Sequence, residues 1–460
     1  MRGISQADTT KITEGTGGMQ LTSKFTINPT AKQETVLRDL SENCRLLYNF
    51  SLFERKFLHE QHGISVSYQD QQNGLPQLKK LFPRYQQVYS KVLQMTLKKL
   101  DGSFKSFYGL VKNGDTDARP PGYRGKSHFF TLCYNQSRFK IDKDTITLSH
   151  KHPDKVALTF AVPFDFTERV IVQIDLHRDR RGRYWLSVVY EFEEPEYVDN
   201  GLYQAFDLGT SKHSAVNLHG QFFDSTIKRV DKYWQPEVRN IQRKMSHCKQ
   251  GSRKWKKLQH KLNIMRSKEA NQTKDWQHKQ AMNYLRNTRA NTIIIGDLSP
   301  KQMANTAKQK KKRRGNKGKK KSSTMSKKQQ TGVNRGVHNT GHLGRFVQLL
   351  AYKARKLGKK VIAIDERHTP MECCVCGWRQ EMPVWQRIYH CENPEGCSNT
   401  RDLDRDRNSD INIMVRFLSL NGLWMTYQHF AGKLRQTANV DLLPRFAKDS
   451  QKEAPCVSVG

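Results

Sequence analysis

The spacing of apolar residues in the first half of the chain predicts a mixture of strands and helices. The segment MQLTSKFTINP, residues 19–29, alternates apolar and polar positions as a half-buried strand does. The segment that follows, to about residue 60, has apolar residues at helical spacing, and a second helix is predicted over about 86–112. RVIVQIDLHRDRRGRYWLSVVYEFEEP, residues 169–195, predicts a β-hairpin with its turn near Asp179 to Gly182.

In the second half, short strands follow one another closely. Residues 202–225, LYQAFDLGTSKHSAVNLHGQFFDS, predict three antiparallel strands, and a basic helical segment follows over about 228–290. Two more buried strands are predicted, TIIIG at 292–296 and KKVIAIDE at 359–366, with an amphipathic helix between them. A strand, helix, strand unit makes its two strands parallel, so their carboxyl ends should meet at one edge of the sheet.

The end of the TIIIG strand poses a problem. Chemistry in an α/β sheet gathers at the carboxyl ends of the central strands, but this strand ends in Gly296, which has no side chain, followed by Asp297. Either an acid has been lost at this strand end, or another segment of the chain supplies it.

The charge of the chain indicates a polyanionic partner. Lys and Arg number 80 against 43 Asp and Glu, a formal net charge of +37, and such an excess favours nucleic acid over a membrane surface. The tract 308–328 alone holds 12 Lys and Arg among 21 residues. We expect it to be a solvated loop that neutralises phosphates, with a nuclear-localisation signal as the alternative.

The remaining composition indicates a globular protein that stays inside the cell. No apolar run approaches the length of a membrane span, and the first 18 residues lack the apolar core of a signal peptide. We expect an intracellular location, which is the cytoplasm or nucleoid if the host is a bacterium and the nucleus if it is a eukaryote.

The cysteines predict one structural metal site. Five of the nine crowd into residues 373–397. Cys373 and Cys376 are separated by two residues, and Cys391 and Cys397 follow after 14 more with a wider spacing of five. Four thiolates in two short loops suit tetrahedral Zn²⁺, and an intracellular chain argues against disulfides. Cys374 is the less favoured ligand in its pair, because 373 and 376 already have the knuckle spacing.

Two carboxylates stand out as candidates for a second site. Asp207 lies within an apolar strand, where an acid is costly unless it is paired or holds a cation. Asp406 lies in DLDRDRNSDINIMVRFL, at the start of a helix. The simpler interpretation of Asp406 is an acid that stabilises the helix N-terminus.

These motifs together resemble the TnpB proteins of bacterial insertion sequences, compact RNA-guided nucleases related to type V CRISPR effectors and Fanzor proteins. The resemblance rests on the DLG hairpin, the long basic helical insert, LAYKARKLGKKVIAIDERHT leading into a CxxC, and a second cysteine pair leading to DRDRNSDINI. It runs from about Gln20 to about Leu420 and is most distinctive in the cysteine and DRDRNSDINI block. It implies an α/β fold with a RuvC/RNase H-like nuclease core, inserted helices and a zinc finger, preceded by a β-barrel-like wedge with a helical recognition region.

In this family an Asp, a Glu and a second Asp form the nuclease site, and Asp207 and Asp406 match the first and third. Gly296 stands where the Glu is usual. Side chains alternate along a strand, so Asp297 should face away from the site and is a poor substitute. We favour Glu366, at the end of the neighbouring parallel strand, where Gly296 leaves it room. This resembles a branch of the family in which the second acid has moved downstream. The alternative is that Glu366 is an ordinary strand-end acid beside Asp365 and that the site is dead.

The expected organisation follows from the resemblance. We expect a disordered tail at 1–18, a wedge at 19–200 with recognition helices at about 30–115, a nuclease core at 201–369, a zinc finger at 370–400, the last nuclease motif at 401–422 and a tail at 423–460. Within the core we expect the basic helices at about 228–290 and a Lys-rich loop at 300–342.

The expected function is RNA-guided cleavage of double-stranded DNA by a transposon-associated endonuclease. Asp207, Glu366 and Asp406 would hold two Mg²⁺ ions, one Zn²⁺ would be structural, and the partners would be a guide RNA and the target DNA. One alternative is a catalytically inactive RNA-guided DNA-binding protein, such as a repressor or a transposition accessory factor. Another is a guide-free nuclease or a transposase.

Overall fold

The computed structural model describes residues 19–135, 137–297, 343–383, 386–397 and 402–442. They fall into two compact units that meet in the chain between Glu193 and Glu194, and each is described by itself. The expected tail at 1–18, the Lys-rich loop at 300–342 and the last residues, 443–460, lie outside the described residues.

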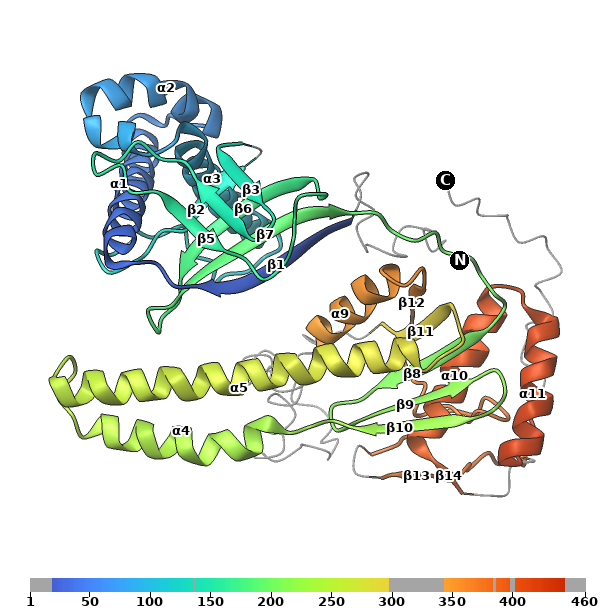
Figure 1. Cartoon of the computed structure of the whole chain (residues 1–460). Coiled ribbons are helices and arrows are strands. Elements are labelled where there is room, and N and C mark those ends of the chain that lie inside the picture. Colours follow the sequence, from blue (N-terminus) through green and yellow to red (C-terminus); the bar gives the residue numbers. More distant parts are fainter. Residues whose placement is uncertain (1–18, 136, 298–342, 384–385, 398–401, 443–460) are drawn as a thin grey trace. The chain divides into compact units, whose positions relative to one another are not determined.

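The N-terminal unit is built on two antiparallel sheets (Figure 1). The larger has the order β1-β7-β6-β2 and contains β1 (Met19–Ile27), β2 (Leu132–Asn135), β6 (Ile171–Arg178) and β7 (Tyr184–Phe192). The smaller contains β3 (Phe139–Asp142), β4 (Thr145–Leu148) and β5 (Leu158–Ala161). The predicted hairpin is confirmed as β6 and β7, and Asp179 stabilises its turn by accepting hydrogen bonds from the backbone of Arg181 and Arg183.

The helices of this unit are α1 (Ala31–His62), α2 (Tyr68–Leu81) and α3 (Ser90–Lys112), with a 3₁₀ turn, η1 (Pro83–Gln87), before α3. The α1 helix begins at a capping box: Thr30 Oγ1 accepts from the Gln33 amide at 3.3 Å, and Gln33 Oε1 accepts from the Thr30 amide at 2.9 Å. It ends at Gly63, whose φ of 65° is the left-handed conformation that glycine adopts without strain. The two helices predicted from spacing are therefore present, and α2 is a third between them.

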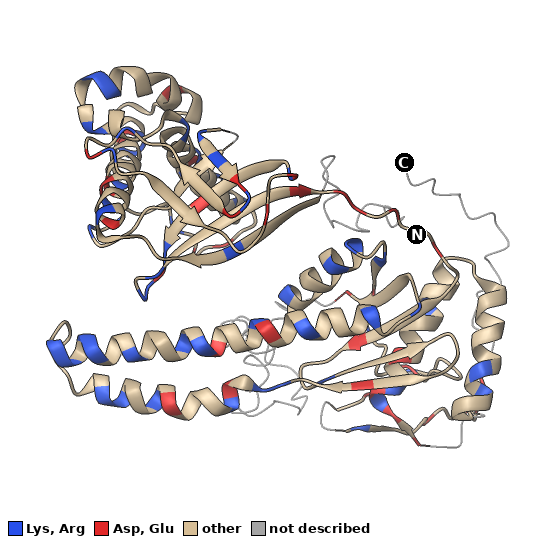
Figure 2. Cartoon of the chain, in the orientation of Figure 1, with Lys and Arg blue, Asp and Glu red and all other residues tan. Residues whose placement is uncertain are grey.

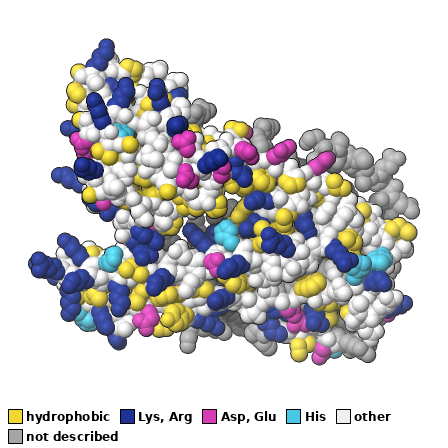
Figure 3. Space-filling model, viewed as in Figure 1, with side chains coloured by type: hydrophobic (Ala, Val, Ile, Leu, Met, Phe, Trp, Pro, Cys, Tyr) yellow, Lys and Arg dark blue, Asp and Glu magenta, His cyan; other side chains and the backbone are white. Residues whose placement is uncertain are grey.

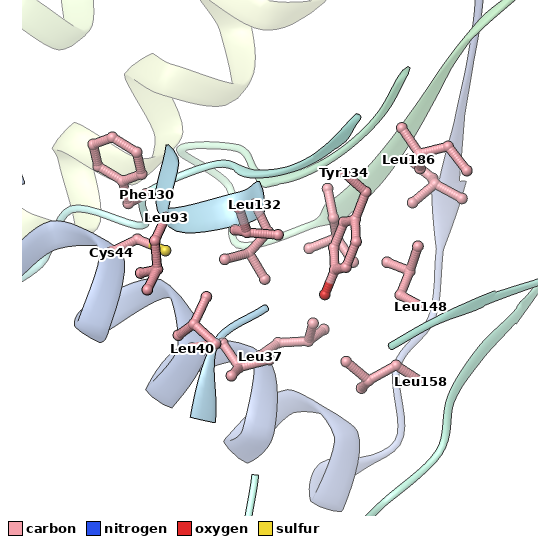
Figure 4. Packing of buried hydrophobic residues seen from close by; sticks show 14 of the residues in the cluster. Leu37, Leu40, Cys44, Leu93, Phe130, Leu132, Tyr134, Leu148, Leu158 and Leu186 are labelled. Carbon is pink, nitrogen blue, oxygen red and sulfur yellow. The ribbon is translucent and has the colours of Figure 1, made fainter. Parts of the chain in front are cut away.

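The core of the N-terminal unit lies between these helices and the strands (Figure 4). Leu37 and Leu40 of α1 and Leu93 of α3 contribute to one cluster with Leu132 and Tyr134 of β2. Because the buried residues of α1 recur three or four positions apart, one stripe of the helix packs into this core. Outside this stripe the helix is mostly polar, but Phe50, Phe53 and Phe57 are exposed.

The C-terminal unit contains a five-stranded mixed sheet in the order β10-β9-β8-β11-β12. Its strands are β8 (Tyr203–Leu208), β9 (Lys212–Asn217), β10 (Phe222–Thr226), β11 (Thr292–Gly296) and β12 (Lys360–Ile364). The first three are antiparallel neighbours, as predicted. The β11 strand runs parallel to both β8 and β12, so the expected parallel pair is also confirmed. The carboxyl ends of three strands thus share one edge.

Helices cover both faces of this sheet, and strand alternation assigns side chains to one face or the other. On one face α10 (Arg405–Leu420) and α11 (Trp424–Ala438) share a core with Ala205 and Ile294. On the other, α5 (Arg253–Arg286) and α9 (Leu343–Arg355) share a core with Phe206, Ile293 and Ile295. The α10 face is therefore the face of even-numbered positions on β11 and of odd-numbered positions on β8.

The predicted basic helical insert is a pair of helices, α4 (Val230–Ser246) and α5, joined by a short connection (Figure 1). Lys and Arg occur along both helices (Figure 2), and their side chains project from the visible face of this pair (Figure 3). Such a surface suits a polyanion more than a buried protein contact.

The structure of residues 424–438 differs from what the sequence analysis expected. The segment from 423 onward was expected to be a tail, but this part of it is the helix α11. Tyr427, Phe430 and Leu434 are buried, at a spacing of three and four residues that forms one helical face. The apolar pattern was therefore present in the sequence. In the part of the chain that the structure describes, no helix has the length and apolar character of a membrane span.

Replacing Leu40 with Ala should lower the unfolding free energy of the N-terminal unit by about 2–5 kcal/mol, because Leu40 is 1% exposed and its removal leaves a cavity. Hydrogen exchange of peptides from 19–193 in rising urea, read by mass spectrometry, measures the change. Leu81→Ala is the matched control, because Leu81 is 72% exposed and should change stability by less than about 0.5 kcal/mol. Equal effects of the two substitutions would contradict the assigned core.

Candidate functional site: carboxylates at one sheet edge

Asp207 lies at the carboxyl end of β8, the central strand of the sheet. It lies an even number of residues along the strand from Tyr203 and Ala205, which pack against α10. Its side chain therefore points to the same face of the sheet, the α10 face. Burial raises the pKa of Asp207 to about 6; a hydrogen bond from Ser409 opposes this change, and the negative charge of Asp406 adds to it. A carboxylate in this position is electrostatically unfavourable without a nearby cation.

Glu366 follows β12 and fills the space that Gly296 leaves open. A Cβ atom placed on Gly296 would come within 3.0 Å of Oε2, Cδ and Cβ of Glu366, nearer than real Cβ atoms approach other atoms. Gly296 is two residues after Ile294 on the same strand, and Ile294 packs on the α10 face. The space beside Gly296 therefore also lies on that face. The side chain of Glu366 therefore stands where a side chain at position 296 would stand.

The electrostatics connect Glu366 with Asp207. Burial, together with the charges of Asp207, Asp297 and Asp365, raises the pKa of Glu366 to about 7. Asp297 itself is exposed, and its backbone amide donates to the Ile364 carbonyl. The charge of Asp207 thus acts on Glu366, and the charge of Asp406 acts on Asp207.

Asp406 is the second residue of α10, and the helix is capped by its neighbour. The Asp404 carboxylate accepts from the amides of Asp406 and Arg407, which leaves the Asp406 side chain available for other contacts. The Asp406 carboxylate forms two ion pairs. Its Oδ2 lies 3.6 Å from Nζ of Lys212, and its Oδ1 lies 3.7 Å from Nη1 of Arg387.

The three carboxylates do not form a tight cluster. Among the described residues, the only group of three or more potential ligands whose atoms all lie within 4.8 Å of one another is Cys373, Cys376, Cys391 and Cys397. The charge of Asp207 thus acts on Glu366 and that of Asp406 acts on Asp207 without such a close grouping, and Lys212 and Arg387 partly balance Asp406. A divalent cation bound there would have to replace or supplement these ion pairs.

A buried polar face of α10 holds the loop that follows β12. Asn408 Nδ2 donates to the Glu372 carbonyl at 2.8 Å, and Asn412 Nδ2 donates to the Thr369 carbonyl at 2.9 Å. Arg416 Nη1 donates to the carbonyls of Asp365 and Arg367, at 2.7 Å and 3.0 Å, on either side of Glu366. The loop that carries Glu366 is therefore fixed to the same helix that carries Asp406.

Asp410 is an acid at this site that the sequence analysis missed. It is fully buried, and its Oδ1 accepts a hydrogen bond from the Asp207 amide at 3.0 Å. Burial and the neighbouring charge of Asp207 raise the pKa of Asp410 well above its usual range. The available signal was its spacing, since an acid four residues after Asp406 lies on the same side of the helix.

The four predicted cysteines come together in space. Sγ of Cys373 lies 3.9 Å from that of Cys397, and Sγ of Cys376 lies 3.5 Å from that of Cys391. These four residues can hold a metal ion. Cys374 is absent from the group; it is buried, and its amide donates to Asn408 Oδ1 at 2.8 Å.

The thiols differ in acidity because their surroundings differ. Burial raises the pKa of Cys373 to about 11. Burial opposes ionisation of Cys376 as well, but hydrogen bonds from the Trp378 backbone and from neighbouring side chains lower its pKa to about 7. Burial also raises the pKa of Cys391 above its usual range. A metal ion that binds thiolates would have to displace these protons.

Two protein-family profiles match parts of the chain. The Cas12f1-like TNB domain matches residues 344–413, from α9 through the cysteine loops into α10. The helix-turn-helix domain named HTH_OrfB_IS605 matches residues 19–63. In this chain the second match covers one strand, β1, and one long helix, α1.

Comparison with known proteins gives relatives of similar length. "Putative RNA-guided DNA endonuclease InsQ" of Escherichia coli (strain K12) is 23% identical over 382 residues, covering 80% of this chain and 86% of that protein. "Putative RNA-guided DNA endonuclease" of Streptomyces pristinaespiralis is 22% identical over 391 residues, covering 84% and 87%.

Among solved structures, a chain of the "Cryo-EM structure of the Cas12f1-sgRNA-target DNA complex" aligns with a TM-score of 0.52 and 13% identity, covering 83% of this chain and 82% of that one. At this identity the likeness shows a shared mixed α/β fold. The matched domains and the two bacterial relatives agree with the resemblance that the motifs indicated, and the chain is similar to the TnpB proteins.

Proposed function

We propose that the protein is an RNA-guided DNA endonuclease whose C-terminal unit is a RuvC/RNase H-like nuclease. The observation that carries the proposal is the side chain of Glu366, which occupies the space of a side chain at position 296 and interacts electrostatically with Asp207. The strand order β10-β9-β8-β11-β12 supports the RuvC/RNase H-like assignment. The names of the two bacterial relatives support the reaction.

In this proposal Asp207, Glu366 and Asp406 hold two Mg²⁺ ions. The raised pKa values of Asp207 and Glu366 support this, because like charges held together in a partly buried site favour a hard divalent cation. Two ions held by these carboxylates would supply activation of the attacking water and stabilisation of the leaving 3′ oxygen of the DNA phosphodiester. The chain orients its own carboxylates: the end of β8 holds Asp207, the first turn of α10 holds Asp406, and Arg416 fixes the backbone on both sides of Glu366.

The proposed partners are a guide RNA and double-stranded target DNA. The net charge of +37 and the basic pair α4 and α5 supply phosphate neutralisation over a large surface. Base pairing with the guide would select the target, and the N-terminal unit would act as the wedge and recognition region that recognises a short flanking motif. Association with a transposon and an intracellular location belong to the same proposal and are supported by the relatives.

The cysteine site is proposed to hold one structural Zn²⁺. A tetrahedral ZnS₄ site with Zn–S bonds of about 2.3 Å requires sulfur atoms about 3.8 Å apart. The observed separations of 3.9 Å and 3.5 Å are close to that value without any ion present. With four protein ligands no coordination position stays open for a substrate, so the ion would have a structural role.

The catalytically inactive alternative remains an outcome of the experiment. A DNA-binding protein that does not cleave DNA could also have these ion pairs of Asp406 with Lys212 and Arg387. It could also have three acids that are not closely grouped. Against it stands the cost of a partly buried Asp207, which an inactive protein has no reason to retain.

Replacing Glu366 with Ala should abolish cleavage, by about a hundredfold or more, because the site loses a metal ligand whose place no neighbour fills. The measurement is cleavage of a plasmid library with randomised flanking sequence by protein expressed with its own flanking locus. Asp297→Ala is the matched control: this exposed acid beside the same strand end should be dispensable. A library bound but uncut by wild-type protein would identify an inactive DNA-binding relative. Cleavage without any bound RNA would identify a guide-free nuclease.

Moving the acid back to β11 should restore cleavage. In the double variant Gly296→Glu with Glu366→Ala, position 296 carries an acid on the α10 face, and the space that Glu366 filled is free for it. We expect a partial return of activity over Glu366→Ala alone, measured with the same library. The single variant Gly296→Ala should lose activity, because its Cβ displaces Glu366. Full activity in Gly296→Ala would contradict the assigned position of Glu366.

Replacing Cys376 with Ala should lower the zinc content of the purified protein from about one ion per chain to near zero, because structural zinc sites need all four ligands. Metal content is measured by mass spectrometry of the acid-digested protein. Cys374→Ala is the control, since this neighbouring thiol is buried but lies outside the four-cysteine group and should leave the zinc content unchanged. Loss of zinc in Cys374→Ala alone would reverse the ligand assignment.

A further inference from the structure

Asp410 is a buried acid that the proposed mechanism does not use. Its side chain is 0% exposed, and its Oδ2 has no hydrogen-bond partner among the described residues. Burial of a polar atom without a partner costs free energy, so a retained group of this kind calls for an explanation. The neighbouring residues Asn408, Ser409 and Asn412 are also buried in this helix, but each has a hydrogen bond to the loop that follows β12.

The Asp410 carboxyl accepts a hydrogen bond from the backbone of Asp207. Pairing of β8 with β11 ends at Phe206 and Ile295, one residue before Asp207. The Asp207 amide then donates to Asp410 Oδ1 at 3.0 Å. The carboxyl of Asp410 thus supplies an acceptor just beyond the end of the strand pairing, at the residue that carries the proposed metal ligand.

The location of Asp410 excludes it as a ligand of the substrate. Asp406 keeps 22% of its side chain exposed, but Asp410 is enclosed between α10 and the sheet. Ser214 pairs with Asp207 on the neighbouring strand β9, and its side chain contributes a hydrogen bond to the Asp410 carboxyl. A DNA phosphate cannot reach this position, whereas the backbone of Asp207 already does.

We infer that Asp410 is a positioning residue: its hydrogen bond to the Asp207 amide fixes the end of β8 so that the Asp207 carboxylate faces Glu366 and Asp406. The inference rests on the proposed nuclease function. Catalytic groups need to be held within about 0.5 Å of the productive geometry. At Asp207 the β8 strand has lost its β11 neighbour and is paired with β9 alone, so the bond to Asp410 supplies the restraint on the β11 side. Outer residues that orient metal ligands typically affect metal affinity or activity by about 10–100-fold.

Two substitutions that keep a side chain branched at Cγ separate the hydrogen bond from the charge. Asp410→Asn keeps an oxygen acceptor for the Asp207 amide and removes the ionisable group. Asp410→Leu fills the space and removes the acceptor. In the complex with guide RNA, cleavage of a matched target is measured across a Mg²⁺ titration, well below the unfolding temperature of each variant. We expect the cleavage rate and the Mg²⁺ requirement of Asp410→Asn to stay within about threefold of the wild-type values. Asp410→Leu should need about tenfold more Mg²⁺ or cleave at least tenfold more slowly, with unchanged target binding.

Hydrogen exchange of the peptide containing residues 203–208 gives a readout that does not depend on cleavage. The Asp207 amide should exchange at the wild-type rate in Asp410→Asn and faster in Asp410→Leu. Asp410→Ala, which cannot clash, replaces the Leu variant if that variant fails to fold. Loss of activity in Asp410→Asn equal to that in Asp410→Leu would overturn the inference, because the charge itself would then be required. Wild-type cleavage and exchange in Asp410→Leu would overturn it as well. If wild-type protein does not cleave, the proposed function fails, and the exchange measurement still decides whether Asp410 holds Asp207.

Discussion

The candidate site depends on the hydrogen bonds between α10 and the loop after β12. Amide groups of Asn408 and Asn412 satisfy the carbonyls of Glu372 and Thr369, which are buried or partly buried, and the guanidinium of Arg416 binds the more exposed carbonyl of Asp365. An unsatisfied buried carbonyl costs about 1–3 kcal/mol, so this set of bonds selects one arrangement of the loop against α10. Apolar side chains in the same places could fill the space, but they could not specify where each carbonyl lies.

This arrangement links two sites of different chemistry. The loop that carries Glu366 continues directly into the first cysteine pair, and the Cys374 amide donates to the same Asn408 that holds the Glu372 carbonyl. The position of the acid and the position of the thiols are therefore set by one helix.

Much of the fold could be predicted from the sequence, because the signals are local. Alternation in 19–27, helical spacing in 31–62 and the apolar runs at 292–296 and 360–364 each correspond to an observed element. The four clustered cysteines were also predictable, since their spacing is a property of the chain itself. The interpretation of 423–460 as a tail failed for 424–438, because the resemblance ended near Leu420 and the apolar spacing of α11 was not used.

The site could be predicted only in part. Parallel pairing of β11 and β12 brings Glu366 beside Gly296, and the sequence indicated this. The roles of Asp410 and Arg416 depend on which backbone groups lie opposite α10, and no spacing rule contains that information. The ion pairs of Asp406, on α10, likewise reach Lys212 on β9 and Arg387 between the two cysteine pairs, and no local pattern in the sequence joins these segments.

A side chain at position 296 and the side chain of Glu366 cannot occupy the same space. This steric conflict limits the order in which substitutions at the two positions can occur during evolution. The space on the α10 face admits one side chain, from either β11 or the segment after β12, but not both. In an ancestor with the usual Glu on β11, loss of that Glu first would pass through an inactive protein. A Glu gained first at 366 would have to point toward solvent while the older acid still served the site. Glycine at 296 would then admit the newer side chain in a single step, and every intermediate would keep one acid in place.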